Sequence, residues 1–192
     1  MVGTADNSEF YDISITQGRV ESGEYTRGTG GMIGAAVSSS IVRSFTTTNV
    51  RGISYYAGGL VGYLDSSSIT DSYAIGVVSG YANLGGLVGT AASSWVENSY
   101  STGAVQGEIY TGGLIGGNFG SANTVISSYW NIETSGLNTS YGGVGKTTQQ
   151  MMQKDTYRDW DFDNTWRIDN GNRYPEFQTP GYIYNCEALQ KI

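Results

Sequence analysis

Short apolar segments separated by glycine and serine recur along the first 145 residues. The clearest block is Gly-Gly, two aliphatic residues and Gly, and successive copies lie 28, 27 and 27 residues apart. The four copies are Gly30–Gly34, Gly58–Gly62, Gly85–Gly89 and Gly112–Gly116, and Gly142–Gly145 is a shortened fifth copy. Such constant spacing is typical of proteins that stack one structural unit repeatedly.

A second block repeats at the same spacing and runs from an aliphatic residue to a Ser-aromatic pair. Its copies are Ile41–Phe45, Ile69–Tyr73, Val96–Tyr100 and Val125–Tyr129. A unit of 27 residues has room for three strands of about five residues and three turns of about four. One such unit cannot bury its apolar face alone, whereas stacked copies can.

We therefore predict an all-β fold, a right-handed parallel β-solenoid (β-helix) of about five coils of 27–30 residues, over residues 1–145. Equivalent strands of successive coils pair in parallel about 4.8 Å apart. We expect aliphatic and aromatic side chains to face inward and glycine to supply corners with positive φ. The competing all-β folds are an up-and-down barrel or a propeller, but a propeller blade needs about 40 residues.

The composition changes after Gly145. The last 47 residues contain seven acids, six bases and both prolines. We predict that residues 146–178 form a C-terminal cap over the last coil, with a short helix N-capped by Thr147 or Thr148 and with Trp160 buried. Residues 179–192 are predicted to be the start of a following module or a tail.

Charge and composition exclude several classes of function. The net charge of −7 argues against a nucleic-acid partner. No run of about 18 apolar residues is present, so we expect no membrane insertion. Without His and with one Cys, the chain has no His-based triad, no His-ligated metal and no internal disulfide.

Tyrosines precede the Gly-Gly pairs, and four of them are our candidate ligand-binding residues: Tyr55, Tyr56, Tyr81 and Tyr110. In a solenoid, equivalent loops stack on one side, so these rings are predicted to form an exposed ladder. A tyrosine combines flat apolar area with a polar tip, which suits a neutral glycan or a protein surface. The alternative is that the rings pack at the corners of the coils.

Acidic residues offer two further kinds of site. Asp159, Asp161 and Asp163 alternate with aromatic residues and are candidate calcium ligands. An EF-hand loop requires Gly and Glu where this chain has Asn164 and Asn170. We therefore interpret the segment as a strand with its acids in water, and we expect no cofactor.

Glycosidic chemistry needs two carboxylates on either side of the scissile bond. The acids in the middle coils are sparse: Asp65, Asp71, Glu97, Glu108 and Glu133. No Lys or Arg occurs between Gly52 and Gly145. We expect no enzymatic activity, and the alternative is a polysaccharide-acting, pectate-lyase-like β-helix enzyme or its substrate-binding accessory domain.

The repeats resemble a known family. The Gly-Gly-Leu-Val-Gly blocks, together with Ser72–Val78 and Ser99–Val105, resemble GLUG repeats. The resemblance implies a structural or adhesive module of a large secreted bacterial surface protein, located outside the cell and joined to neighbouring domains of a longer chain. GLUG repeats have no catalytic residues to carry over to this sequence.

Overall fold

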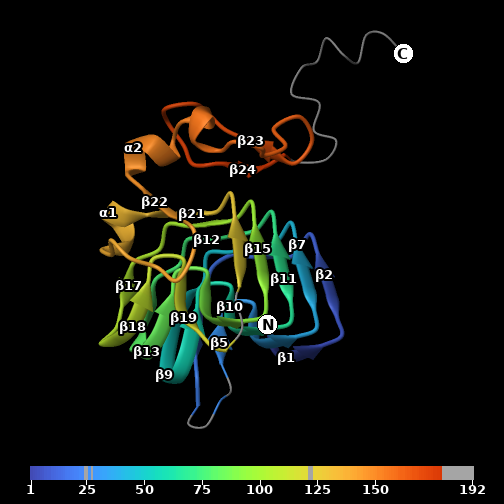
Figure 1. The fold of residues 1–192 in the computed structure, drawn as a ribbon, viewed down its shortest axis with the longest axis vertical. Helices are drawn as coiled ribbons and strands as arrows, with labels where there is room; N and C mark the ends of the chain where they lie inside the picture. The colour runs from blue at the N-terminus through green and yellow to red at the C-terminus, as the bar shows by residue number, and fades with distance from the viewer. Residues whose placement is uncertain (24–25, 27, 121–122, 179–192) are drawn as a thin grey trace.

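The computed structural model describes residues 1–23, 26, 28–120 and 123–178. In this part of the chain the fold is an all-β solenoid of about four turns, as Figure 1 shows. Each complete turn contributes a strand to each of four parallel sheets, here named A to D. The prediction of an all-β parallel solenoid is confirmed, but a complete coil has four strands rather than the expected three. The right-handed winding stays a prediction.

The sheets are ladders of equivalent strands from successive turns. Sheet A contains β1 (Val2–Asp6), β6 (Ile33–Val37), β10 (Val61–Asp65), β14 (Val88–Ala92) and β19 (Ile115–Asn118). Sheet B contains β2 (Glu9–Tyr11), β7 (Ser40–Val42), β11 (Ser68–Thr70), β15 (Trp95–Glu97) and β20 (Thr124–Ile126). Sheet C contains β3 (Ser14–Ile15), β8 (Phe45–Thr46), β12 (Tyr73–Ala74), β16 (Tyr100–Ser101), β21 (Tyr129–Asn131) and β22 (Val144–Lys146). Sheet D contains β4 (Arg19–Glu21), β5 (Thr29–Gly30), β9 (Asn49–Gly58), β13 (Val78–Gly85), β17 (Val105–Gln106) and β18 (Ile109–Gly112).

The fifth turn is incomplete, so the predicted count of about five coils is slightly too high. After β21 the side chain of Asn131 accepts hydrogen bonds from the N–H groups of Glu133 and Thr134 and caps helix α1 (Ile132–Ser135). After the helix, Leu137 packs against the apolar cluster of sheet D without forming a strand. The predicted fifth copy, Gly142–Gly145, therefore does not start another strand of sheet A. It leads into β22, which pairs with β21 in sheet C.

Two corners of the middle coils are built on serine. At the corner between sheets B and C, a residue at positive φ such as Asp71 precedes a buried serine such as Ser72. The Ser72 hydroxyl donates to the Thr70 carbonyl and accepts from the N–H of Ser44 in the preceding coil. The same ladder continues through Ser99 and Ser128, and a second ladder at the corner between sheets A and B contains Ser39, Ser67 and Ser94. Serine thus satisfies backbone donors that the turning chain leaves buried.

The expectation that the repeat glycines supply positive-φ corners is wrong for the four complete blocks, although Gly143 of the shortened fifth copy has positive φ. None of the glycines in the four Gly-Gly blocks has positive φ, and at the corners Asp, Asn, Ser and Arg residues adopt it instead. The blocks need glycine because two backbones approach closely. A Cβ on Gly86 would overlap the carbonyl oxygen of Gly113 in the next coil and lie 2.7 Å from the Ser101 hydroxyl.

The solenoid interior and its outer wall contain different side chains. Ile41, Leu60 and Ile69 belong to the main apolar core between sheets A, B and C, and Ala74 joins them from sheet C. Tyr73, beside Ala74, belongs to a separate aromatic cluster outside the coils. The prediction that the repeat aromatics face inward is therefore wrong for this ladder. The positive φ of Asp71 breaks the strand alternation that relates Ile69 to Tyr73.

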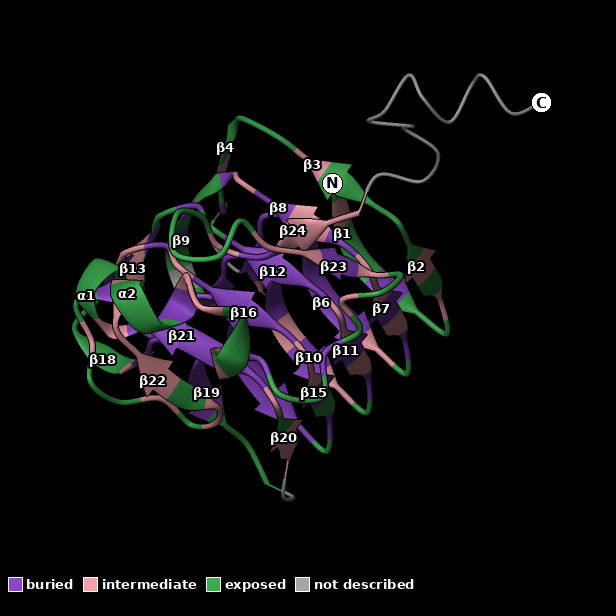
Figure 2. Cartoon of the chain, turned by 90° about the horizontal axis from the view of Figure 1, so that it is seen from above, coloured by how far each residue is buried: buried purple, intermediate pink, exposed green. Residues whose placement is uncertain are grey.

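The C-terminal segment covers the side of the solenoid. It contains α2 (Thr148–Met151), a 3₁₀ helix (Lys154–Thr156), β23 (Trp166–Arg167) and β24 (Glu176–Phe177), the last two forming a small antiparallel sheet. Thr147 caps α2 through a capping box with Gln150, as the sequence predicts. Viewed from above in Figure 2, these elements lie over the strands of sheet C. Trp160 packs against Tyr100 and Tyr129, so the segment is a lateral cover rather than a cap on the last coil alone. The predicted module start at residues 179–192 lies outside the described residues.

Candidate functional site

The four candidate tyrosines lie on sheet D, on the lower part of the solenoid in Figure 1. Tyr55 and Tyr56 belong to β9, Tyr81 to β13 and Tyr110 to β18. The side chains of Tyr55, Tyr81 and Tyr110 are 57%, 47% and 59% exposed, and Tyr56 is partly buried. The alternative, that these rings pack at the corners of the coils, therefore does not apply to the three exposed tyrosines.

The four rings do not form a regular ladder. Tyr55 is in register with Ala82, and Ala82 is in register with Ile109. Tyr81 precedes that position, next to a register shift between Gly80 and Ala82. Equivalent positions in successive coils therefore hold different side chains, and the tyrosines are spread over three coils. The adjacent Tyr55 and Tyr56 rings lie 6.1 Å apart.

A smaller aromatic group lies beside them. The Tyr56 ring is 5.6 Å from both Tyr63 of sheet A and Phe119, which follows β19. Phe119 is exposed, so this group adds apolar area next to the candidate tyrosines. Tyr63 and Phe119 were not predicted from the sequence, because they lie outside the segments that precede the Gly-Gly pairs.

The face formed by sheet D carries exposed aliphatic side chains as well. Ile53 and Ile109 are exposed next to the tyrosines on the same strands. Together the residues Ile53, Tyr55, Tyr81, Ile109, Tyr110 and Phe119 are here named the sheet D surface. An exposed group of large apolar side chains on a rigid scaffold is typical of a contact site for another molecule.

The candidate calcium ligands do not form a metal cluster. The Asp161 carboxylate accepts hydrogen bonds from the N–H groups of Asp163 and Asn164, from the Asn164 amide and from the Thr165 hydroxyl. These bonds hold the pKa of Asp161 below its usual value. Within the described ranges, no group of three or more His, Cys, Asp or Glu residues is placed to hold a metal ion. The segment is a turn and not the predicted strand. Asp161 therefore stabilises this turn rather than offering free oxygens to a cation.

The acids of the middle coils are distributed over the wall, and Asp71 and Glu97 lie in adjacent coils. The Asp71 carboxylate accepts a hydrogen bond of 2.9 Å from the indole N–H of Trp166. Burial raises the pKa of Asp71, opposed by the hydrogen bonds from Trp166 and Asn98, while the charges of Glu97 and Asp161 raise it further. The Asp71 carboxylate thus joins the solenoid to the C-terminal segment.

The geometry defines a parallel β-solenoid repeat protein with a lateral C-terminal cover. Residues 53–79, which span one coil, match the family model described as the GLUG motif. The chain therefore contains a GLUG-repeat region. No curated protein and no solved structure matches it. No helix in the described part of the chain has the length and apolar character to cross a bilayer.

Proposed function

We propose that this chain is a non-enzymatic structural and adhesive repeat module of a bacterial surface protein, located outside the cell and joined to neighbouring domains of a longer chain. The observation that carries the proposal is the exposure of Tyr55, Tyr81 and Tyr110 on one sheet of a rigid solenoid. Strands paired across every coil fix the positions of these rings, so contacts with a ligand cost little conformational entropy.

The charge of this region favours a neutral partner. No Lys or Arg lies between Gly52 and Gly145, and Glu108 is in the same coil as Tyr110. An anionic glycan or a nucleic acid is repelled by such a surface. A neutral glycan or a protein surface makes use of the apolar ring faces and the phenolic hydroxyls.

The test is binding of the full chain to a panel of neutral glycans and extracellular host proteins. The matched variant combines Tyr55→Ala and Tyr110→Asn, because Ala82 and Asn83 occupy these positions in the intervening coil. Asn tolerates the positive φ of Tyr110. We expect the double variant to lose at least tenfold in affinity and to keep its melting temperature, since the removed rings are exposed.

Trp95→Thr is the control, because Trp95 is an exposed aromatic residue of sheet B in register with Thr124. Equal loss of binding in the control and in the double variant would contradict the proposal. Turnover of any glycan in the panel would favour the alternative, a polysaccharide-acting enzyme.

A further inference from the structure

A stack of aromatic rings on sheet C ends at an open position. The rings of Phe45 and Tyr73 are 4.7 Å apart at an interplanar angle of 10°, and those of Tyr73 and Tyr100 are 4.9 Å apart at 7°. The residue in register with Phe45 in the preceding coil is Ser14. Serine does not fill the space of a ring, so the stack stops with one face of Phe45 directed toward a small side chain.

A groove of about 440 Å³ opens at this end of the stack. Ser14, Phe45 and Tyr73 line it from the solenoid, and Phe177 and Gln178 line it from the C-terminal segment. The Phe177 ring stands at 65° to that of Phe45, with 6.0 Å between the centroids. The groove therefore has an aromatic floor and an aromatic side wall.

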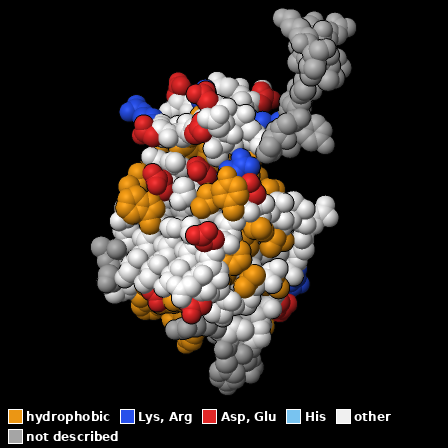
Figure 3. Space-filling model, turned by 90° about the vertical axis from the view of Figure 1, so that its right-hand side faces the viewer, with side chains coloured by type: hydrophobic (Ala, Val, Ile, Leu, Met, Phe, Trp, Pro, Cys, Tyr) orange, Lys and Arg blue, Asp and Glu red, His pale blue; other side chains and the backbone are white. Residues whose placement is uncertain are grey.

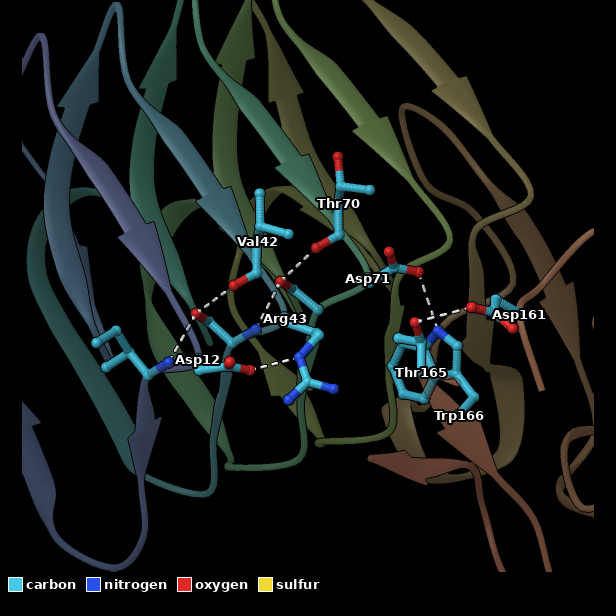
Figure 4. Close-up of polar contacts among 11 residues, drawn as sticks. Asp12, Val42, Arg43, Thr70, Asp71, Asp161, Thr165 and Trp166 are labelled. Atoms are coloured by element: carbon cyan, nitrogen blue, oxygen red, sulfur yellow. Dashed lines mark hydrogen bonds and ion pairs between the residues drawn. The ribbon is translucent and has the colours of Figure 1, made fainter. Parts of the chain in front are cut away.

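Two ion pairs supply the polar groups of the groove. The Arg43 guanidinium pairs with the Asp12 carboxylate, as Figure 4 shows, and it also lies 5.5 Å from the centre of the Phe177 ring. Arg167 pairs with Glu176 at 2.9 Å. Where the C-terminal segment meets the solenoid, Figure 3 shows acidic and basic side chains next to hydrophobic ones. Each pair is neutral as a whole, so the groove offers donors and acceptors without a net charge.

This combination selects a class of ligand. A charged ligand would have to break an ion pair, whereas a hydroxyl group can accept from a guanidinium and donate to a carboxylate. A pyranose ring has one flat face of C–H groups and a rim of such hydroxyls. A purely apolar ring would use the Phe45 face but leave the polar groups of the groove without partners, which costs free energy.

We propose that the groove binds a neutral pyranose unit of a saccharide, stacked on Phe45 and hydrogen-bonded to the Arg43–Asp12 and Arg167–Glu176 pairs. The sugar ring takes the place in the stack that Tyr73 and Tyr100 occupy in later coils. The site lies on sheet C and is separate from the sheet D surface, so either can fail without the other.

The decisive variant is Ser14→Tyr in the full chain. Tyrosine already occupies the same ladder position in three later coils, as Tyr73, Tyr100 and Tyr129, so the new ring is expected to continue the stack on Phe45 and fill the groove. The probes are short neutral oligosaccharides of glucose, galactose or mannose, titrated by calorimetry. We expect one of them to bind the parent protein and to lose at least tenfold in affinity with Ser14→Tyr, while the melting temperature is unchanged or raised.

A second variant guards against misfolding of the first. Phe45→Leu keeps an apolar side chain but removes the aromatic face, and a stacked ring is worth about tenfold in affinity. The sheet D double variant, Tyr55→Ala with Tyr110→Asn, should leave binding at this groove unchanged.

Three results would overturn the inference. One is that none of the neutral saccharides binds the parent protein. Another is that a saccharide binds equally well to the parent, Ser14→Tyr and Phe45→Leu proteins. The third is that a tyrosine-containing peptide binds in a Ser14-dependent way while all saccharides fail, which would assign the groove to a protein partner.

Discussion

The indole N–H of Trp166 donates a hydrogen bond of 2.9 Å to the carboxylate of Asp71, joining two residues 95 positions apart in the chain. Figure 4 shows this bond at the corner between sheets B and C. Trp166 is fully buried and also packs on Trp160 and Phe177. The corner of one repeat is thus the point at which the C-terminal segment is oriented on the solenoid.

The charge of Asp71 is expected to lower the stability of the fold at neutral pH. Burial raises the pKa of Asp71 above its ordinary value of 3.8. Just above pH 3.8 the folded protein therefore holds more protons than the unfolded chain, and the free energy of unfolding falls as pH rises through this window. Asp71→Asn removes the ionising group, so the free energy of unfolding no longer falls in this pH window. The Asn amide oxygen still accepts a hydrogen bond from Trp166, and we therefore expect a more stable protein at pH 7.

Asparagine suits this position because Asn98 occupies it in the next coil, also at positive φ. Asp71→Ala is the comparison, since it leaves the buried Trp166 N–H without its acceptor at a cost of about 1–3 kcal/mol. Urea denaturation of both variants at pH 4 to 7 is the measurement. A lower stability of Asp71→Asn at pH 7 would mean that the charged hydrogen bond outweighs the burial of the carboxylate.

The serine ladders are expected to contribute to stability through single hydroxyl groups. Ser72→Ala removes the acceptor of the Ser44 N–H, which is buried between two coils. We expect a loss of about 1–3 kcal/mol in the free energy of unfolding. Ser68→Ala is the control, because the Ser68 hydroxyl donates to another side chain, the partly buried Ser40 hydroxyl, rather than accepting from a buried backbone N–H. Equal effects of the two substitutions would show that the ladder hydroxyl has no special role.

The glycines of the repeat are expected to be intolerant of a methyl group. Gly86→Ala places a Cβ against the Gly113 carbonyl and the Ser101 side chain, and both lie in the packed interior of the coils. Overpacking of this kind costs about 1–3 kcal/mol or more. Gly3→Ala is the matched control because no atom lies within 4 Å of its Cβ position. Thermal melts that agree for the two variants would contradict the close-approach explanation.

The sequence predicts the strand ladders well because one unit is repeated in register. Ile41, Ile69 and Val96 are equivalent in the sequence blocks and directly paired in sheet B. The sequence predicts wrongly that the aromatic residues of the repeat face the interior. The alternation of inward and outward positions assumes an unbroken strand between Ile69 and Tyr73. The positive φ of Asp71 turns Ala74, rather than Tyr73, toward the core.

Two features of the candidate sites could not be predicted from the sequence, because both depend on how the coils and the C-terminal segment pack. The exposed tyrosines could be located because they precede the repeated Gly-Gly pairs. Their register could not, because β9 has one residue more than β13 between the paired positions, two between Gly52 and Tyr55 against Tyr81 alone, and this shifts the pairing locally. The groove beside Phe45 depends on contacts between Arg43 and Phe177, which are far apart in the sequence, so no local pattern reveals it.

The aromatic cluster is expected to make the protein sensitive to alkali. Burial raises the pKa of Tyr73, Tyr100 and Tyr157 above the ordinary value of 10. Above that pH the unfolded chain has lost protons that the folded protein keeps, so the free energy of unfolding falls as pH rises. We expect cooperative unfolding in alkali, with phenolate absorbance and loss of β-sheet circular dichroism in one transition. Tyr100→Phe should weaken this pH dependence, and gradual ionisation of all tyrosines without unfolding would contradict it.

Substitution of Trp160 tests whether the C-terminal segment covers the side of the solenoid or caps its last coil. Its side chain is 6% exposed, its ring centre is 4.4 Å from that of Trp166, and its indole N–H bonds to the Ser127 carbonyl. Trp160→Ala is therefore expected to cost about 3–5 kcal/mol in the free energy of unfolding. Because the segment lies over sheet C, the loss should uncover tyrosine rings such as Tyr100 rather than the edge of a strand.

The readouts are therefore a lower melting temperature and increased binding of an apolar dye, with a protein that stays monomeric in sedimentation. Trp95→Thr, on the exposed face of sheet B, is the control and should change neither property. End-to-end association of Trp160→Ala would instead indicate that the segment protects unpaired strand edges, because open edges recruit further strands. An unchanged melting temperature would show that Trp160 does not hold the segment on the solenoid.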